Sequence, residues 1–169
     1  MQDMRIQLEA LHPTEQTEQK SAWFTLPIYE DELSETLGIE EDSEDFTVAD
    51  TDLPYDFIKA GDETITLDEI NDIYHMFEDL PSDIQDEIEE LMEEYDSLED
   101  LHDQRHDIIH YSGCRNMADV AREILNETGE LRNLPEYLQE HFDYVSYGES
   151  LEENGTWIIT NSGVFELPY

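Results

Sequence analysis

Basic residues are scarce in this chain, and one long stretch has none. The 169 residues include 46 Asp and Glu against 7 Lys and Arg, which gives a formal net charge of −39. Neither Lys nor Arg occurs between Ala60 and Gln104. A surface with this charge repels phosphate groups, so nucleic acid and anionic membranes are excluded as direct partners. Cationic partners are favoured: basic proteins, metal ions or polyamines.

Cysteine and long apolar runs are also scarce. Cys114 is the only cysteine, so no disulfide can form within the chain. No run approaches the roughly 18 apolar residues of a membrane span, and residues 1–6 lack the apolar core of a signal peptide. We therefore expect a cytoplasmic protein.

The apolar residues that are present indicate a folded chain. High charge favours disorder, but 38% of the residues are hydrophobic and they recur at regular spacings. We expect an α+β fold, built as an elongated chain of three small domains. Residues 1–61 form a mixed sheet with one helix, residues 62–105 an acidic helical domain, and residues 106–169 a sheet with helices.

Local patterns place the elements of the two outer domains. In the first domain we expect strands at 6–10, 22–26 and 46–49, a helix at 30–37 stopped by Gly38, and loops at 12–20 and 40–45. In the last we expect a strand at 108–111, a helix capped by Asn116 and ended by Gly129, helical turns at 135–138 and 144–151, and a hairpin over 156–167.

The acidic middle carries helix signals and an unusual charge density. Capping boxes are expected at Thr66 and Ser82, and a cap at Ser97. The 18 residues Asp83–Asp100 contain ten acids. As one helix they would span about 27 Å, or one charge per roughly 2.7 Å, against about 1.7 Å in duplex DNA. Acids four apart repel each other, and no interleaved cation offsets this repulsion.

Three patterns raise the question of bound metal or catalysis. His102, His106 and His110, with Asp103 and Asp107 beside them, would form a metal site on one continuous helix. A strand at 108–111 would break that face, so we favour histidines paired with carboxylates. Residues 50–62 lack the glycine at the sixth position and the closing glutamate of an EF-hand loop.

Cys114 has His110 and Arg115 nearby in sequence, and such cations can lower the pKa of a thiol. A lone cysteine is a weak basis for catalysis. The chain also lacks a phosphate-binding glycine loop and a Gly-x-Ser-x-Gly motif. We therefore expect no enzymatic activity, no cofactor and no specific metal.

Several short motifs, in order along the chain, resemble those of the ArdA antirestriction proteins. The first is residues 22–28, Ala-Trp-Phe-Thr-Leu-Pro-Ile, although Ser21 stands where the family pattern has glycine. The others are Leu80-Pro81, residues 107–110, 119–122, 127–129, Tyr147-Gly148, and 155–156 through 165–166. Each piece is weak alone, but together they span both ends of the chain.

The resemblance implies a function. ArdA proteins are carried by plasmids and conjugative transposons, mimic duplex DNA, and occupy the DNA-binding groove of type I restriction-modification enzymes. They are elongated homodimers of three small domains, joined through the C-terminal domain, and none of their residues is catalytic. The family's antirestriction motif falls around 125–138 here. Two chains would carry twice −39, or −78, the charge of about 39 base pairs.

These inferences name two sets of residues. The expected DNA-mimic surface consists of the acids of the middle stretch: Asp62, Glu63, Asp68, Glu69, Asp72, Glu78, Asp79, Asp83, Asp86, Glu87, Glu89, Glu90, Glu93, Glu94, Asp96, Glu99, Asp100 and Asp103. The expected dimer contacts are apolar residues of one helix: Met117, Val120, Ile124 and Leu125. Two alternatives stay open, an acidic chaperone or buffer for basic DNA-binding proteins and a weak divalent-cation buffer.

Overall fold

The computed structural model describes residues 3–12, 20–39 and 45–168, and much of the loops expected at 12–20 and 40–45 lies outside them. The described part holds two three-stranded antiparallel sheets and eight helices, which confirms the α+β class. It divides into two compact units. Unit one runs to Leu80 and includes Tyr95–His102, and unit two is Pro81–Glu94 with Asp103 onward. The division into three domains stays a prediction.

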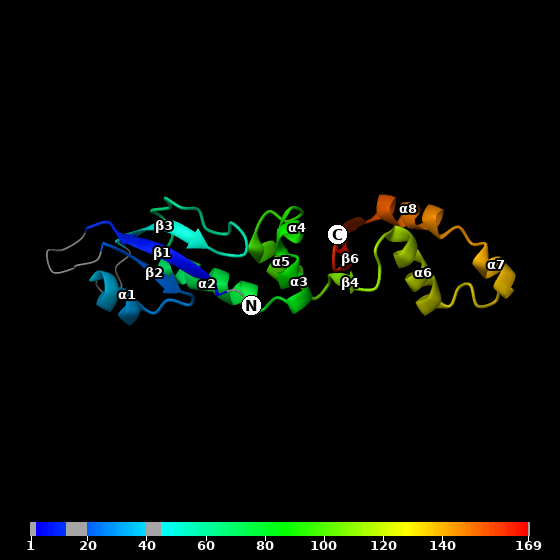
Figure 1. The fold of residues 1–169 in the computed structure, drawn as a ribbon, viewed down its shortest axis with the longest axis horizontal. Helices are drawn as coiled ribbons and strands as arrows, with labels where there is room; N and C mark the ends of the chain where they lie inside the picture. The colour runs from blue at the N-terminus through cyan, green and yellow to red at the C-terminus, as the bar shows by residue number, and fades with distance from the viewer. Residues whose placement is uncertain (1–2, 13–19, 40–44, 169) are drawn as a thin grey trace. The chain divides into compact units, whose positions relative to one another are not determined.

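Unit one is built on a sheet in which β1 (Arg5–Ala10) lies between β2 (Ser21–Thr25) and β3 (Phe46–Asp52) (Figure 1). Both neighbours run antiparallel to β1. Ile6 and Leu8 are fully buried, while the residues between and beside them are not. This alternation is the expected one for a sheet with one face on the core. All three predicted strands are confirmed, and β3 continues three residues beyond the predicted end.

Helix α1 (Glu30–Leu37) follows the sheet's second strand. It buries Leu33 and Leu37, as their spacing predicts. Its end lies at Gly38, which adopts the left-handed conformation with φ 67° and donates its N–H to Ser34. A residue with a Cβ is strained there, so glycine fixes where the helix stops.

Helix α2 (Leu67–Glu78) begins with the predicted capping box. The Thr66 hydroxyl accepts the N–H of Glu69, and the Glu69 carboxylate accepts the N–H of Thr66. The Asn71 side chain bonds both the N–H and the C=O of Ile28, each at 2.8 Å. This double hydrogen bond ties α2 to the segment that follows β2, and no sequence pattern predicts it.

The acidic helix expected to open at Ser82 and continue over residues 83–96 is not continuous. The chain instead forms α3 (Ser82–Asp86), α4 (Ile88–Met92) and α5 (Leu98–Gln104). Glu87 leaves the helical conformation at φ −112° and ψ 28°. The break at Glu87 separates Asp86 from Glu90, so this pair of acids no longer lies on one continuous helix. Buried apolar side chains on each short helix supply the anchoring instead.

Two helix caps were expected in this stretch, at Ser82 and at Ser97, and only the second is confirmed. Ser82 is not a cap, because the N-cap residue of α3 is Pro81 and no side chain caps the helix. The Pro81 carbonyl accepts the N–H groups of Ile84 and Gln85. Ser97 does cap α5, since its hydroxyl accepts the N–H of Asp100 at 3.2 Å.

The sheet of unit two has the order β4-β6-β5. Its strands are β4 (Ile109–Tyr111), β5 (Thr156–Thr160) and β6 (Gly163–Leu167), all antiparallel to their neighbours (Figure 1). The predicted hairpin is confirmed. Its turn is Asn161-Ser162, and β6 supplies the most deeply buried strand of the unit.

Helices α6 (Met117–Thr128), α7 (Glu136–Glu140) and α8 (Tyr144–Asn154) complete unit two. The predicted cap of α6 is confirmed, because the side chain of its N-cap residue accepts the N–H of the third helical residue. The Arg122 guanidinium lies 4.8 Å from the Tyr144 ring centre. None of the described helices combines the length and the apolar character needed to cross a membrane.

Helices α6 and α8 approach closely. A Cβ built on Gly148 would lie 2.7 Å from the carbonyl carbon of Met117. Since Tyr144 meets Arg122 and Gly148 meets Met117, α8 runs antiparallel to α6. The core beside them contains Tyr111, Cys114, Met117, Val120 and Val164, with Ile124, Leu151 and Trp157 packed against it.

Candidate functional site

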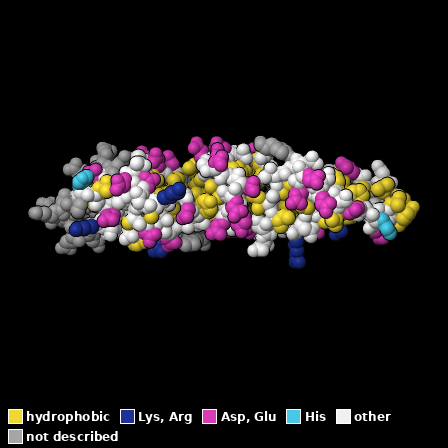
Figure 2. All heavy atoms as spheres, turned by 90° about the horizontal axis from the view of Figure 1, so that it is seen from above, with side chains coloured by type: hydrophobic (Ala, Val, Ile, Leu, Met, Phe, Trp, Pro, Cys, Tyr) yellow, Lys and Arg dark blue, Asp and Glu magenta, His cyan; other side chains and the backbone are white. Residues whose placement is uncertain are grey.

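The acids expected to form the binding surface are on the outside of the protein. All 18 lie within the described residues; fifteen are exposed, and Asp62, Asp83 and Glu87 are half-buried. The apolar residues of the same segments, such as Ile70 and Leu91, are buried. On the face drawn in Figure 2, Asp and Glu side chains are spread widely and Lys and Arg are few. The middle stretch therefore combines an apolar interior with a carboxylate exterior.

The two units share these acids. Ten of the 18 belong to unit one, on and around α2 and the start of α5, and eight belong to unit two, mainly on α3 and α4. Each unit thus carries an acidic surface of its own. We call residues 81–94 of unit two the acidic segment.

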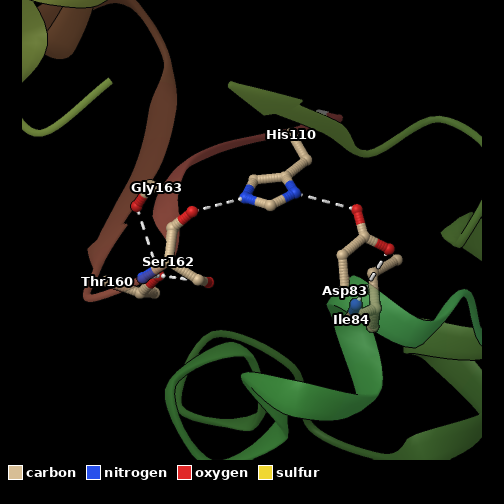
Figure 3. Close-up of polar contacts among 6 residues, drawn as sticks. All are labelled: Asp83, Ile84, His110, Thr160, Ser162 and Gly163. Atoms are coloured by element: carbon tan, nitrogen blue, oxygen red, sulfur yellow. Dashed lines mark hydrogen bonds and ion pairs between the residues drawn. The ribbon is translucent and has the colours of Figure 1, made fainter. Parts of the chain in front are cut away.

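Four of the 18 acids hold local structure. Asp62 accepts the N–H and the hydroxyl of Thr64, each at 2.8 Å, and Glu69 completes the capping box of α2. Asp79 contacts His102 at 3.2 Å, and Asp83 contacts His110 at 3.0 Å (Figure 3). The Thr64 backbone bond is the main cause of a lowered Asp62 pKa, and the Thr64 hydroxyl also contributes. Mutating these four acids would therefore mix effects on folding with effects on binding.

The histidines do not share a helix face. Helix α5 ends at Gln104, and His110 belongs to β4. His102 and His110 each pair with a carboxylate, as the favoured interpretation predicted. In the described part of the chain, no three His, Cys, Asp or Glu side chains gather closely enough to hold a metal ion.

The neighbouring cations do not lower the pKa of Cys114, in agreement with the view that a lone cysteine is a weak basis for catalysis. The Cys114 side chain is buried, and its thiol donates to the Glu123 carboxylate at 3.0 Å. Burial, then this hydrogen bond and the negative charge of Glu123, raises the pKa of Cys114 to about 12. The group is a neutral thiol at physiological pH, which makes it a poor nucleophile.

We therefore expect Cys114 to resist thiol reagents. At pH 8 the native protein should react with a disulfide reagent far more slowly than the urea-unfolded chain does. The raised pKa of Cys114 also affects the stability of the fold. The stabilisation that comes from keeping this thiol protonated is fully present below the unfolded pKa near 9 and is lost as pH rises toward about 12. Equal reaction rates for folded and unfolded protein would contradict this.

Self-repulsion among the exposed carboxylates leads to a second prediction. Salt screens such charges, with a Debye length of about 10 Å at 0.1 M. Raising NaCl from about 20 mM to about 500 mM should raise the melting temperature by several degrees, measured by circular dichroism. A midpoint that stays constant across this series would show that repulsion contributes little.

The residues expected at a dimer contact are largely inside unit two. Val120 is fully buried, Met117 and Leu125 are nearly so, and Ile124 is partly buried against the same core. Because they are already largely buried within unit two, their apolar character alone no longer indicates a dimer contact, and their place in a dimer interface stays a prediction. Four exposed apolar side chains of this third lie around α7, and two more lie on strands of the sheet: Leu134, Tyr137, Leu138 and Val145 in the first group, Ile109 and Ile159 in the second. The sequence predicted only a single helical turn at 135–138, and a helix this short cannot bury the apolar side chains around it.

Comparison with known proteins gives the family. No match was found among curated proteins. A model of the family described as Antirestriction protein (ArdA) matches residues 15–166, which is most of the chain and includes both sheets in part or whole. ArdA proteins are inhibitors without enzymatic activity. The chain therefore belongs to the ArdA family of antirestriction proteins.

Proposed function

We propose that this protein is a DNA mimic that occupies the DNA-binding groove of type I restriction-modification enzymes. The observation that supports the proposal most is the exposure of fifteen of the 18 acids over a stretch that contains no Lys or Arg. Carboxylates in such number repel each other, so a stretch without Lys or Arg favours a cationic partner. These enzymes act on DNA in the cytoplasm, and we place the protein there.

In the proposed mechanism, carboxylates of the protein take the place of DNA phosphates in the groove of the enzyme. A DNA-binding groove uses Lys and Arg to neutralise phosphates, and binding releases the counterions held by the DNA. Exposed carboxylates can bind the same cations and release their own counterions. Because carboxylates carry no base edges, the same surface can inhibit enzymes that recognise different DNA sequences.

The test is a titration of a type I enzyme with this protein during cleavage of labelled DNA. A mimic inhibits at near one-to-one stoichiometry, and the inhibition does not grow with incubation time. An acidic chaperone or buffer for basic proteins needs a large excess. Inhibition that increases with time at a substoichiometric dose would indicate an enzyme and overturn the proposal.

We also propose that the protein acts as a homodimer through unit two, with α7 at the contact. The apolar side chains left exposed there support this, since hydrophobic side chains gathered on a surface mark interaction sites. Replacing both Tyr137 (64% exposed) and Leu138 (43% exposed) by Asp should give monomers in sedimentation at micromolar concentration. Their exposure means that the monomer should keep its fold.

The control separates dissociation from unfolding. Val120→Asp places a charge in the core of unit two, so this variant should unfold. A wild-type protein that is already monomeric at micromolar concentration would contradict the dimer proposal. Dimers that persist in the double variant would contradict only the placement at α7.

A further inference from the structure

We propose that unit one contacts the target enzyme through the outer face of its sheet, where a Lys or Arg side chain of the DNA-binding groove stacks on the ring of Trp23. This proposal rests on the proposed function and adds one specific contact to the distributed carboxylates. The outer face consists of the side chains of β1, β2 and β3 that point away from the core of unit one (Figure 1).

Trp23 lies on a sheet face that is otherwise polar. Gln7 of β1 lies opposite Trp23 of β2 and Asp50 of β3, and residues directly opposite each other share a face. The neighbouring outward positions on the three strands hold Ser, Thr, Arg, Glu or Asp. Trp23 is nevertheless 44% exposed. A sheet face that meets water normally carries polar side chains, so the fold of unit one does not account for a tryptophan there.

The ring of Trp23 already contacts one cation. The guanidinium carbon of Arg5 lies 5.7 Å from the centre of the Trp23 ring, and an Arg5 nitrogen lies 2.6 Å from Asp52 Oδ2. The Asp52 carboxylate thus holds the guanidinium beside the ring. Tryptophan binds cations more strongly than the other aromatic side chains, through the negative face of its π system. Because Trp23 and the Arg5 side chain are both about half exposed, a cation from a partner can reach the same ring.

The charges around Trp23 favour a cationic partner. The outward positions of the strands carry one cation, Arg5, and three carboxylates: Glu9, Asp50 and Asp52. The other two cations of unit one lie elsewhere. Lys20 precedes β2 and, by the alternation of that strand, belongs to the opposite face, while Lys59 lies in the turn beside β3, at the other edge of the sheet. The outer face is therefore net negative and attracts Lys and Arg side chains.

A contact at Trp23 differs in kind from the contacts of the carboxylates. Tryptophan and arginine are enriched among the few residues that dominate the binding energy of protein interfaces. An indole ring holds no condensed counterions, so binding a cation on it releases none. We therefore expect Trp23 to raise the affinity by the same factor at every salt concentration. As a single fixed point, it would also set where unit one lies along the groove.

Substitution of Trp23 tests the contact in the full-length protein. Trp23→Leu should weaken binding to a type I enzyme by about tenfold, and Trp23→Phe by less, because phenylalanine keeps a weaker π face. The slope of log affinity against log salt should stay that of the wild type. Wild-type affinity in Trp23→Leu would overturn the proposal. So would a loss that flattens the slope, since the effect would then belong to the carboxylates.

Two variants of the same unit serve as controls. Tyr29 is 65% exposed and lies outside the sheet, so Tyr29→Leu removes an exposed aromatic ring from another place and should leave the affinity unchanged. Arg5→Gln removes the neighbouring cation and should not weaken binding. If Tyr29→Leu loses as much affinity as Trp23→Leu, the effect is not specific to the sheet face. If Arg5→Gln does, the contact belongs to the Arg5 guanidinium. Either result overturns the proposal.

Shielding of the ring gives a second measurement, which does not need a substitution at position 23. In Trp157→Phe, Trp23 is the only tryptophan of the chain. 5-Hydroxytryptophan incorporated at that position can be excited without exciting the tryptophans of the enzyme. Acrylamide should quench its fluorescence in the free protein and much less in the complex. Equal quenching in both states would overturn the proposal, even if Trp23→Leu does not fold.

The outcomes for this contact and for the DNA mimic can be told apart. If the protein displaces DNA from the enzyme while position 23 stays accessible to acrylamide, the mimic stands and the contact at Trp23 is wrong. If the protein does not bind a type I enzyme, both proposals are wrong.

Discussion

Changing six carboxylates of the acidic segment to amides should weaken binding to a type I restriction enzyme by about 3 kcal/mol, a roughly hundredfold loss. The six are Asp86, Glu87, Glu89, Glu90, Glu93 and Glu94, which leave the contacts of Asp83 intact. Each exposed ion pair contributes about 0–1 kcal/mol, so any single change should be nearly silent. The measurement is inhibition of DNA cleavage as a function of protein concentration.

The matched control removes the same charge elsewhere. Amides at six exposed acids outside the middle stretch and the 125–138 motif change the net charge equally: Glu30, Glu32, Glu35, Glu149, Glu152 and Glu153. This variant should lose much less inhibition. If a single change in the acidic segment abolishes inhibition while the protein stays folded, the function belongs to a specific site and a distributed mimic is wrong.

Gly148→Ala should destabilise unit two by about 2–3 kcal/mol. The added Cβ would lie 2.7 Å from both the carbonyl carbon and the carbonyl oxygen of Met117, and these backbone atoms cannot move without shifting α6 against α8. Urea unfolding monitored by tryptophan fluorescence would measure the loss, since Trp157 packs against the core of this unit.

Gly113→Ala is the control for this prediction. A Cβ at Gly113 meets nothing within 4 Å, so the same chemical change should be nearly neutral there. Equal midpoints for Gly148→Ala and wild type would show that α6 and α8 are not packed as closely as the structure has them.

Much of the local structure was predictable because its causes lie close together in the sequence. The cap at Thr66 depends on Glu69, three residues away, and the end of α1 depends on Gly38. Alternation predicts β1, and short apolar runs next to turn residues predict β2, β5 and β6. Exposure of the acids was predictable too, since carboxylates without paired cations do not enter a core.

The features that were not predictable depend on distant residues. Glu87 interrupts the helix, so α3 and α4 each bury their own apolar side chains. The helical spacing of apolar residues in the sequence does not show this interruption. The contact of His110 with Asp83 spans 27 positions. The burial of Val120 within its own chain depends on Tyr111 and Val164 from the sheet. The periodicity of α6 showed an apolar face but not what covers it.

The central claim is that this protein and DNA compete for one groove, and direct competition tests it. A type I enzyme bound to labelled duplex DNA would be titrated with this protein, and bound DNA measured by fluorescence anisotropy at several salt concentrations. The account predicts full displacement of DNA and an affinity for the protein that falls linearly on a log–log plot against salt. A ternary complex that retains both DNA and this protein would contradict the account.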